Sequence, residues 1–266
     1  MSQLQDKVVL ITGSTQGIGA ASARACVEAG AKVMLHGRNE ERAKELCAEL
    51  GKNTAYCIKS LTDADTAPYI MGEVLKKFGR LDVLVNNAGI FPRNDISSLG
   101  DENYDQIMTV NLRTPLFLCK EAVEVFRTQP TKGCIVNIGS INAHVGQSDL
   151  LIYSISKGGL MTMTRNLGDS LAKEGIRVNQ LNVGWTVTDT EHALKMSEGL
   201  PEHWESLVPK MFAPTGKLMH PEDIAKHVVF WASDSSAPVT GQVYSCEQYP
   251  AEGRNIIPEV QSYINK

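Results

Sequence analysis

The stretch Lys7-Val-Val-Leu-Ile-Thr12, followed by Gly13-Ser-Thr-Gln-Gly17-Ile-Gly19, decides the fold. Residues 7–12 show no alternation of polar and apolar side chains, which predicts a strand buried on both faces. The small residues at 16–29 predict a helix, and Gly30 provides the residue that ends it. A buried strand, a glycine-rich turn and a helix form the first half of a βαβ unit.

The same alternation continues along the chain. We expect further strands at 32–36, 54–58, 81–85, 134–138, 177–182 and 242–245, and further helices at 40–50, 63–78, about 101–127, about 150–173 and 221–233. Strands separated by single helices imply right-handed crossovers and a parallel sheet covered on both faces. The sequence therefore predicts an α/β fold with a doubly wound parallel sheet of about seven strands, in a single domain spanning residues 1–266.

Two segments do not follow this alternation. Residues 184–216 carry tryptophans, histidines and prolines in irregular order, and residues 247–266 form a polar tail with two prolines. We expect loops with short helices in both. The first segment follows the carboxyl end of a strand, where ligands bind in open α/β sheets, and is therefore predicted to be a substrate loop.

Composition restricts the possible functions. The 266 residues include 26 Lys and Arg against 30 Asp and Glu, a net charge of −4, which argues against binding to nucleic acid or to an anionic membrane surface. The six cysteines form no C-x-x-C pair and have no histidine at zinc-ligand spacing, so we expect reduced thiols and no metal site. The first apolar run, 8–11, is far too short to span a bilayer, and we expect a cytoplasmic protein without a targeting segment.

The turn after the first strand has the spacing G-x-x-x-G-x-G. Glycines let the backbone turn sharply and let a pyrophosphate approach the N-terminus of a helix, where free N–H groups favour an anion. This predicts a dinucleotide-phosphate site at Gly13, Ser14, Thr15, Gln16, Gly17, Ile18 and Gly19. The alternative is a plain strand-to-helix turn.

The end of the second strand indicates which dinucleotide binds. A free ribose 2′-hydroxyl calls for an acidic residue at this point, and a 2′-phosphate calls for a cation. Residues 36–39 contain no acid, and Arg38, followed by Asn39, is placed to meet a phosphate, so NADP is favoured while NAD stays possible. The alternative is that Arg38 is a solvated surface charge. After the fourth strand, Asn87, Ala88 and Gly89 suit a backbone packed close to a nucleoside.

Four polar residues form the candidate catalytic set: Asn111, Ser140, Tyr153 and Lys157. Tyr153 and Lys157 are four residues apart near the start of a predicted helix and so share one face. A phenol with a pKa of about 10 is a poor base at neutral pH, and a neighbouring cation is expected to lower that value. Ser140 ends the fifth strand and can donate to the same substrate oxygen, while Asn111 can hold a water that relays protons.

With these motifs in order, the chain resembles the single-domain branch of the short-chain dehydrogenase/reductase family. The resemblance spans about residues 5–247 and rests on TGxxxGIG at 12–19, NNAG at 86–89, Asn111, Ser140, and YxxxK at 153–157, with the tyrosine thirteen residues after the serine. It implies a Rossmann-type sheet, a nicotinamide cofactor and a homotetramer or homodimer. It also implies that Tyr153 is the acid/base, Ser140 orients the substrate oxygen, Lys157 binds the nicotinamide ribose, and Asn111 supports a water chain.

The sequence departs from the family pattern at three places. Val183-Gly184 stands where the family has Pro-Gly, in a segment where Thr186 and Thr188 are the other expected cofactor contacts. Ser60-Leu61 stands where an Asp contacts the adenine, so Leu61 is the expected contact. Cys246-Glu247-Gln248 stands where the family has Asp-Gly-Gly.

Residues after the fourth, fifth and sixth strands are expected to surround the substrate. They are Arg93, His144, Gln147 and Trp185, with His192 as a further candidate. This polar set with one aromatic wall suits a small polyhydroxylated molecule, and Arg93 can meet an anion. For each of these residues the alternative is a solvated loop position.

The sequence thus predicts an NAD(P)-dependent oxidoreductase that interconverts a secondary alcohol and a ketone on a sugar, a polyol or another small polar substrate. One alternative is a 3-oxoacyl-thioester reductase. A nucleotide-binding regulator without turnover is disfavoured, because a pure binder has no need of Tyr153. A structural oligomer would have no need of the glycine turn.

Overall fold

The computed structural model describes residues 2–250 and contains one parallel sheet of seven strands in the order β3-β2-β1-β4-β5-β6-β7. Every predicted strand is present. The strands are β1 (Val8–Ile11), β2 (Lys32–Gly37), β3 (Thr54–Ile58), β4 (Val83–Asn86), β5 (Cys134–Ser140), β6 (Arg177–Val183) and β7 (Val243–Cys246). Of the predicted polar tail, residues 251–266 lie outside the described part of the chain.

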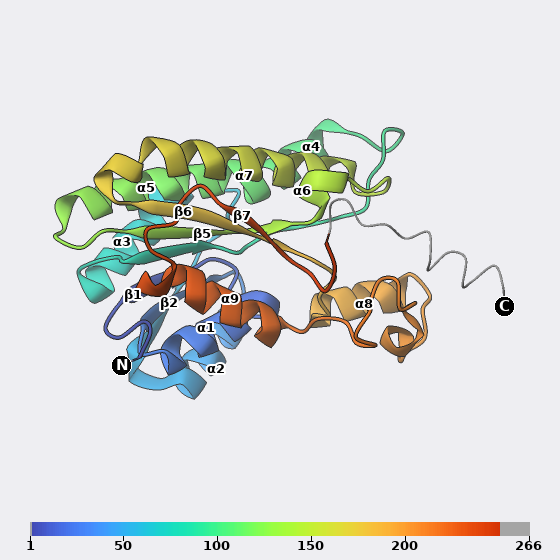
Figure 1. The fold of residues 1–266 in the computed structure, drawn as a ribbon, viewed down its shortest axis with the longest axis horizontal. Helices are drawn as coiled ribbons and strands as arrows, with labels where there is room; N and C mark the ends of the chain where they lie inside the picture. Colours follow the sequence, from blue (N-terminus) through green and yellow to red (C-terminus); the bar gives the residue numbers. More distant parts are fainter. Residues whose placement is uncertain (1, 251–266) are drawn as a thin grey trace.

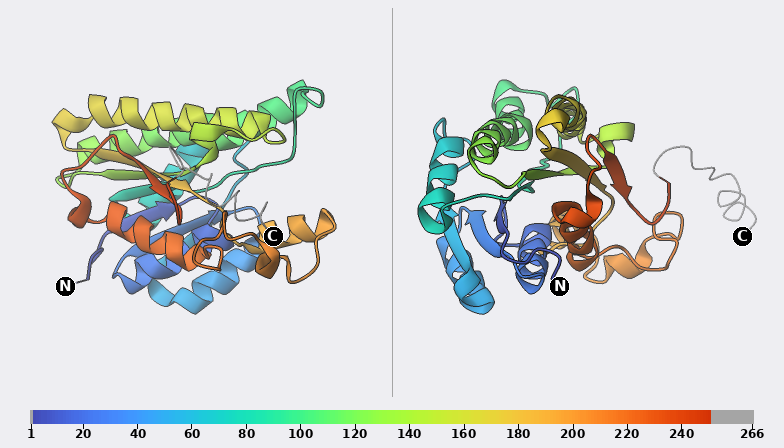
Figure 2. Two further views of the ribbon diagram at one scale, coloured as in Figure 1. Left: turned by 45° about the vertical axis from the view of Figure 1, so that its right-hand side comes forward. Right: turned by 60° about the vertical axis from the view of Figure 1, so that its left-hand side comes forward.

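Helices cover both faces of this sheet and make three layers (Figure 1). One face is covered by α1 (Gly17–Glu28), α2 (Glu40–Leu50) and α9 (Pro221–Ala232), and the other by α3 (Thr66–Phe78), α4 (Asp101–Met108), α5 (Thr114–Thr128) and α7 (Leu151–Ser170). The two turned views in Figure 2 show the same separation. The predicted α/β, Rossmann-type, doubly wound fold is confirmed.

The apolar first strand shows why the layers form. All four residues of β1 are buried: Val9 and Ile11 pack into the cluster under α1 and α9, and Val8 and Leu10 pack into the cluster under α3 and α5. A strand between two helical layers has no face for polar side chains, as its unbroken apolar run predicts. Burial also raises the pKa of the thiols of Cys26, Cys57 and Cys119 to about 12, so these cysteines are inert.

The strand order reverses direction between β1 and β4. From β1 the chain adds β2 and β3 on one side, then returns to place β4 to β7 on the other. The chain therefore leads from β1 and from β4 to helices on opposite faces of the sheet, and the carboxyl edge at this switch point is the usual ligand position in open α/β folds.

The predicted helix at 101–127 is not continuous. It consists of α4, a π-helical segment (Thr109–Arg113) and α5. A π-helical turn inserts one extra residue and is common at functional sites. Asn111 lies at the middle of this segment, so the irregularity re-aims the side chain that the sequence singled out.

The predicted substrate loop, 184–216, contains α8 (Asp189–Ser197) and a short 3₁₀ turn (Trp204–Leu207). It has a small core of its own, in which Val187, Trp204, Ala213 and Leu218 are buried. The loop projects beyond the carboxyl edge of the sheet, beside the start of α9 (Figure 1).

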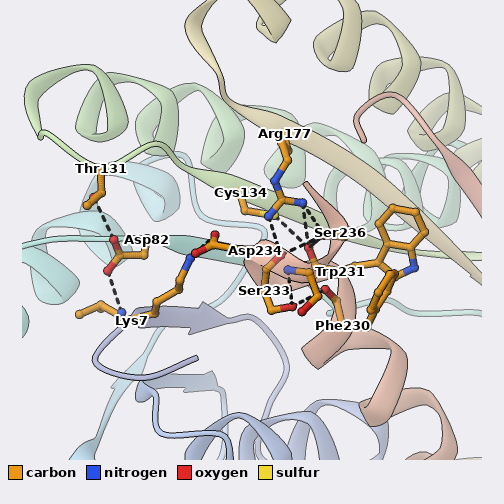
Figure 3. Close-up of polar contacts among 12 residues, drawn as sticks. Lys7, Asp82, Thr131, Cys134, Arg177, Phe230, Trp231, Ser233, Asp234 and Ser236 are labelled. Carbon is orange, nitrogen blue, oxygen red and sulfur yellow. Dashed lines mark hydrogen bonds and ion pairs between the residues drawn. The ribbon is translucent and has the colours of Figure 1, made fainter. Parts of the chain in front are cut away.

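The opposite, amino edge of the sheet is held by buried charges (Figure 3). Arg177, which is 8% exposed, donates to the carbonyls of Trp231 (3.2 Å) and Ser233 (2.9 Å) and to the Ser236 hydroxyl (2.6 Å). Both carbonyls stand at the carboxyl end of α9, where a cation is favoured by the helix dipole. Asp82 accepts the N–H of Val8 at 2.9 Å on the same edge.

We predict that Arg177→Met lowers the free energy of unfolding by about 2–4 kcal/mol, because two buried carbonyls and one hydroxyl each lose a charged donor. Arg127→Met is the matched control: this exposed arginine pairs with Glu124 and Glu174, and its loss is expected to change the free energy of unfolding far less, because water screens both ion pairs. Urea unfolding measures both. Equal losses in the two variants would contradict the role given to Arg177.

Candidate active site

The carboxyl edge of the sheet forms a cavity of about 520 Å³. Its walls come from the segments after β1, β4, β5 and β6 and from α7 and α8. Three of the four predicted catalytic residues, Ser140, Tyr153 and Lys157, line it, together with Ile18, Asn87, Gly89, Val183, Gly184, Thr186 and Thr188 of the predicted cofactor set.

The glycine turn packs so tightly that side chains are excluded from it. Gly13 has a φ of +62°, and a Cβ on it would lie 2.9 Å from the Cα of Ala88. A Cβ on Gly19 would lie 2.3 Å from the carbonyl oxygen of Gly13. The side chain of Gln16, the N-cap residue of α1, makes no hydrogen bond to the helix, so the first N–H groups of α1 have no capping side chain. This cradle at a helix N-terminus fits a pyrophosphate.

His36 shapes this turn, a role that the sequence analysis missed. Burial lowers the pKa of its imidazole to about 4, so the ring is neutral at pH 7. Its Nδ1 lies 3.3 Å from the N–H of Gly13, and its Nε2 lies 3.0 Å from the carbonyl of Lys59. These partners assign the proton to Nε2 and make Nδ1 the acceptor for Gly13. A buried histidine at the end of a strand was the only sequence signal for this contact.

The residues that are expected to distinguish NADP from NAD, and to contact the adenine, lie after β2 and β3. Arg38 is exposed and makes no ion pair or hydrogen bond within residues 2–250, so its guanidinium is available to an anion. The side chain of Asn39 is already used as the N-cap of α2, where it accepts the N–H of Arg42 at 3.0 Å. Leu61 is buried, and its carbonyl accepts from the hydroxyl of Thr114.

Other predicted cofactor residues hold the turn in place. Asn87 donates its side-chain amide to the carbonyls of Thr12 (2.8 Å) and Gly13 (3.1 Å), and the N–H of Ala88 donates to the Thr12 hydroxyl. The hydroxyl of Ser14 donates to the carbonyl of Ile11 at 2.8 Å. Thr15, Gln16 and Gly17 line a separate cavity of about 600 Å³ on the outer side of α1.

Asn111 is buried and pairs with the backbone of Ile90 in both directions. Its Oδ1 accepts the N–H of Ile90 at 2.9 Å, while its Nδ2 donates to the Ile90 carbonyl at 2.8 Å and to the Ser156 hydroxyl at 3.1 Å. Both amide hydrogens are therefore used within the protein, and only Oδ1 retains a lone pair for a water. Asn111 joins the segment after β4 to α7, which the sequence did not indicate.

Tyr153 and Ser140 both line the cavity, Ser140 from the end of β5 and Tyr153 from the first turn of α7. The pKa of the phenol is raised above its usual value of 10, chiefly by burial; the Ser140 hydroxyl, which can donate to the phenolate, lowers it, and nearby Glu191 raises it. The expected lowering of this pKa is therefore wrong for the protein alone, because burial of the phenol is the largest cause of the shift and Lys157 is not among its causes. At neutral pH the phenol is protonated and stands ready to donate.

Lys157 is 4% exposed and has no carboxylate partner within the described part of the chain. Its Nζ donates to the carbonyl of Ile138 at 2.8 Å and lies 5.6 Å from the centre of the Tyr153 ring. Burial lowers the pKa of this ammonium to about 8. A Cβ on Gly89 would lie 3.4 Å from Nζ, so the small residue leaves room for the lysine.

The predicted substrate residues divide into two groups. Arg93, Gln147 and Trp185 line the cavity, whereas His144, on the short helix α6 (Asn142–Val145), does not. His192 lines the other cavity, and its Nδ1 accepts from the indole of Trp204. Whether each of these side chains lines the cavity depends on how its helix or loop is oriented in the fold, and no local sequence pattern indicates that orientation.

The cavity is also more aromatic than the single wall expected from the sequence. Phe91, Phe212 and Tyr249 line it in addition to Trp185. The Trp185 ring stacks on Trp204 with centroids 5.6 Å apart, and its indole N–H donates to Glu191 at 3.0 Å. These residues come from segments far apart in the sequence, so only the fold brings them together.

Comparison with known proteins agrees with this geometry. A family model described as enoyl-(acyl carrier protein) reductase, from the short-chain dehydrogenase family, matches residues 13–248. An uncharacterized oxidoreductase of Thermotoga maritima is 36% identical over 91% of this chain and 96% of its own. Galactitol 2-dehydrogenase of Agrobacterium fabrum is 31% identical over 92% and 97%, and the 3-oxoacyl-(acyl-carrier-protein) reductase FabG of Thermotoga maritima is 34% identical over 91% and 96%.

The chain therefore belongs to the short-chain dehydrogenase/reductase family, as the sequence motifs predicted. It is an NAD(P)-dependent oxidoreductase that acts on CH–OH or carbonyl groups. Among residues 2–250, no helix combines the length and apolar character needed to cross a membrane. Nor does any group of three or more His, Cys, Asp or Glu side chains in that range form a metal-binding arrangement.

The lowered pKa of Lys157 predicts a pH-dependent stability. Because the folded protein holds this proton less tightly than the unfolded chain, the stability penalty is present below pH 8 and disappears as the pH rises to about 10.5. Lys157→Met should therefore be more stable than the wild type at pH 7, by up to about 3 kcal/mol, with the difference shrinking by pH 10. Urea unfolding at both pH values measures this.

The exposed Lys173→Met is the matched control and should leave the pH dependence of stability unchanged. An unchanged pH dependence in Lys157→Met as well would show that Lys157 carries no burial penalty.

Proposed function

We propose that this enzyme interconverts a secondary alcohol and a ketone on a sugar, a polyol or another small polar substrate, and uses NADP in preference to NAD. The observation that carries the proposal is that Ser140 and Tyr153 line the same 520 Å³ cavity, with the buried Lys157 ammonium beside the phenol ring. Asn111 completes the proposed catalytic set by fixing the segment after β4.

The two hydroxyls do the proton chemistry. A substrate oxygen that accepts hydrogen bonds from both Ser140 and Tyr153 is held with its carbon facing the cofactor crevice. Tyr153 gives its proton to that oxygen on reduction and takes it back on oxidation. A bound nicotinamide would supply or accept the hydride. Lys157 favours the phenolate that remains after donation, and its proposed second role is to bind the nicotinamide ribose.

The proposed cofactor contacts follow the cavity walls. The segment at Val183, Gly184, Thr186 and Thr188 meets the carboxamide end, the glycine turn meets the pyrophosphate, and Leu61 with Asn87 to Gly89 borders the adenosine half. Arg38 is the proposed contact of the 2′-phosphate, because it is exposed and makes no ion pair with the described residues.

Charge at the cavity mouth supports a neutral substrate. Arg93 pairs with Asp149 (3.3 Å) and Glu198 (2.9 Å), and Lys195 pairs with Glu198 (2.7 Å) and lies 3.8 Å from Glu191. These two cations face three carboxylates, so an anionic substrate finds no uncompensated positive charge there.

The remaining walls suit a hydroxylated molecule. Asn142 and Gln147 offer amides, and the aromatic faces of Trp185 and Phe212 can pack against the C–H surface of a sugar. The relative named galactitol 2-dehydrogenase is consistent with a polyol.

A 3-oxoacyl-thioester reductase is the second candidate. The apolar side chains of Ile138, Ile141, Leu150 and Phe212 line the same cavity and could accept a short acyl chain. The relative named 3-oxoacyl-(acyl-carrier-protein) reductase supports this alternative. The neutralised cations at the mouth argue against it, because an acyl carrier brings a phosphate to that position.

Tyr153→Phe should retain NADPH binding and lose at least about 99% of turnover, since the proton donor is removed while the ring remains. A panel of galactitol, other polyols and sugars, and 3-oxo esters, followed by NADPH absorbance, measures turnover. NADPH fluorescence measures binding.

Phe91→Leu serves as a control that changes the ring packed against Tyr153 without removing a proton donor. Turnover of Tyr153→Phe close to that of the wild type would exclude Tyr153 from the chemistry. A preference for 3-oxo esters over every polyol would replace the proposed substrate class by the second candidate.

Arg38→Ala should weaken NADPH binding about tenfold or more and leave NADH binding nearly unchanged, because the lost interaction is a charge-assisted bond to the 2′-phosphate. Arg24→Ala removes the same charge from α1, where Arg24 already pairs with Glu49, and should change neither affinity. Fluorescence titration with both cofactors measures the four affinities. Equal losses for NADPH and NADH in Arg38→Ala would contradict this assignment.

A further inference from the structure

Two of the departures from the family pattern meet in space. Val183 ends β6 and is followed by Gly184, and Cys246 ends β7 and is followed by Glu247 and Gln248; these neighbouring strands pair Val183 with Cys246. The ladder continues one step further, because the N–H of Gly184 donates to the carbonyl of Cys246 at 3.0 Å.

Beyond Gly184, the strand-to-strand backbone bonding of the described residues ends, and the side chain of Glu247 accepts the next backbone N–H groups instead. Its Oε2 accepts the N–H of Trp185 at 3.0 Å, and its Oε1 accepts the N–H of Gln248 at 2.7 Å. Each oxygen of the carboxylate thus accepts one backbone N–H. A glutamine at this position would have only one oxygen, and its NH₂ group could not accept the second N–H.

The Glu247 carboxylate occupies the space that the missing side chain of Gly184 leaves open. A Cβ on Gly184 would lie 1.8 Å from Oε2 and 2.3 Å from Cδ of Glu247. Any side chain at 184 would push the carboxylate away and break its bond to Trp185. The position of the Glu247 carboxylate therefore depends on glycine at 184.

Gln248 holds the other end of the substrate loop. Its Oε1 accepts from the hydroxyl of Thr215 at 2.6 Å, and its Nε2 donates to the carbonyl of Lys217 at 2.6 Å. Glu247 at the start of the loop and Gln248 at its end are consecutive residues. We call this pair the clasp, because it joins both ends of the 184–216 loop to the edge of the sheet.

We propose that Glu247 is a positioning residue that fixes the backbone of Trp185, and through it the segment 184–188 and the aromatic wall of the cavity. This inference rests on the proposed function, in which that segment contacts the nicotinamide end of the cofactor. Glu247 holds Trp185 from the backbone side, while Glu191 and Trp204 hold its ring.

The test uses four variants: Glu247→Ala, Glu247→Gln, Gly184→Ala and the double variant Gly184→Ala/Glu247→Ala. Glu247→Ala should raise the Michaelis constant KM for NADPH about tenfold and change kcat less, because a loosened segment weakens cofactor binding more than it slows the chemical step. Glu247→Gln should fall between wild type and Glu247→Ala, since one of its two backbone donors would face an NH₂ group. Glu28→Ala, at an exposed position of α1, is the control and should match wild type.

The sharpest readout is non-additivity. Gly184→Ala alone should resemble Glu247→Ala, and the double variant should be no worse than Glu247→Ala, because the added methyl then meets no carboxylate. A second readout needs no cofactor: amide hydrogen exchange at Trp185 in the free protein should be about tenfold faster in Glu247→Ala and in Gly184→Ala.

These readouts separate the clasp from the proposed function. If the wild type does not bind NADP(H), the proposed function fails, while amide exchange at Trp185 in the free variants still decides whether the clasp fixes this backbone. Unchanged exchange at Trp185 in Glu247→Ala, or losses that add in the double variant, would overturn the inference.

Discussion

The site depends on one interaction, the hydrogen bond from the Lys157 ammonium to the carbonyl of Ile138, made in a position nearly closed to water. No carboxylate among residues 2–250 neutralises this charge, and the lowered pKa of about 8 records the cost of its burial. A protein keeps such a group where the charge serves a reaction, because burying an unpaired cation destabilises the fold. Gly89 leaves the space for it, and Tyr153 lies against it.

The sheet topology brings the other parts to this position. The reversal of strand order between β1 and β4 opens the crevice, and the glycine turn after β1 packs directly on Ala88 after β4. His36 and Asn87 then fix that turn from β2 and β4 with hydrogen bonds to its backbone. These contacts hold the backbone of the glycine turn in one conformation before a ligand binds.

The sequence predicted the layers of the fold well, since buried parallel strands and glycine-ended helices carry strong local patterns. It also identified Ser140, Tyr153 and Lys157, which the fold brings to one cavity. It could not predict the direction of the Tyr153 pKa shift, because desolvation depends on every segment that covers the ring.

Long-range packing accounts for the other differences. The π-helical segment at Asn111 has no propensity signal, and the lining by Phe91, Phe212 and Tyr249 depends on three separate loops. The clasp is a further long-range contact that the sequence alone did not indicate. Val183 and Cys246-Glu247 each looked like an isolated departure from the family pattern, and the sequence did not show that Val183 pairs with Cys246 or that the Glu247 carboxylate lies against Gly184.

The most direct test of this account is a crystal structure of the protein with NADP⁺ bound. The account predicts that the nicotinamide ring lies in the 520 Å³ cavity, with its ribose within hydrogen-bonding distance of Lys157 and the Tyr153 hydroxyl on the side of the reacting carbon. A nicotinamide bound in the outer cavity beside α1 and α2, or a Tyr153 hydroxyl directed away from the ring, would contradict it.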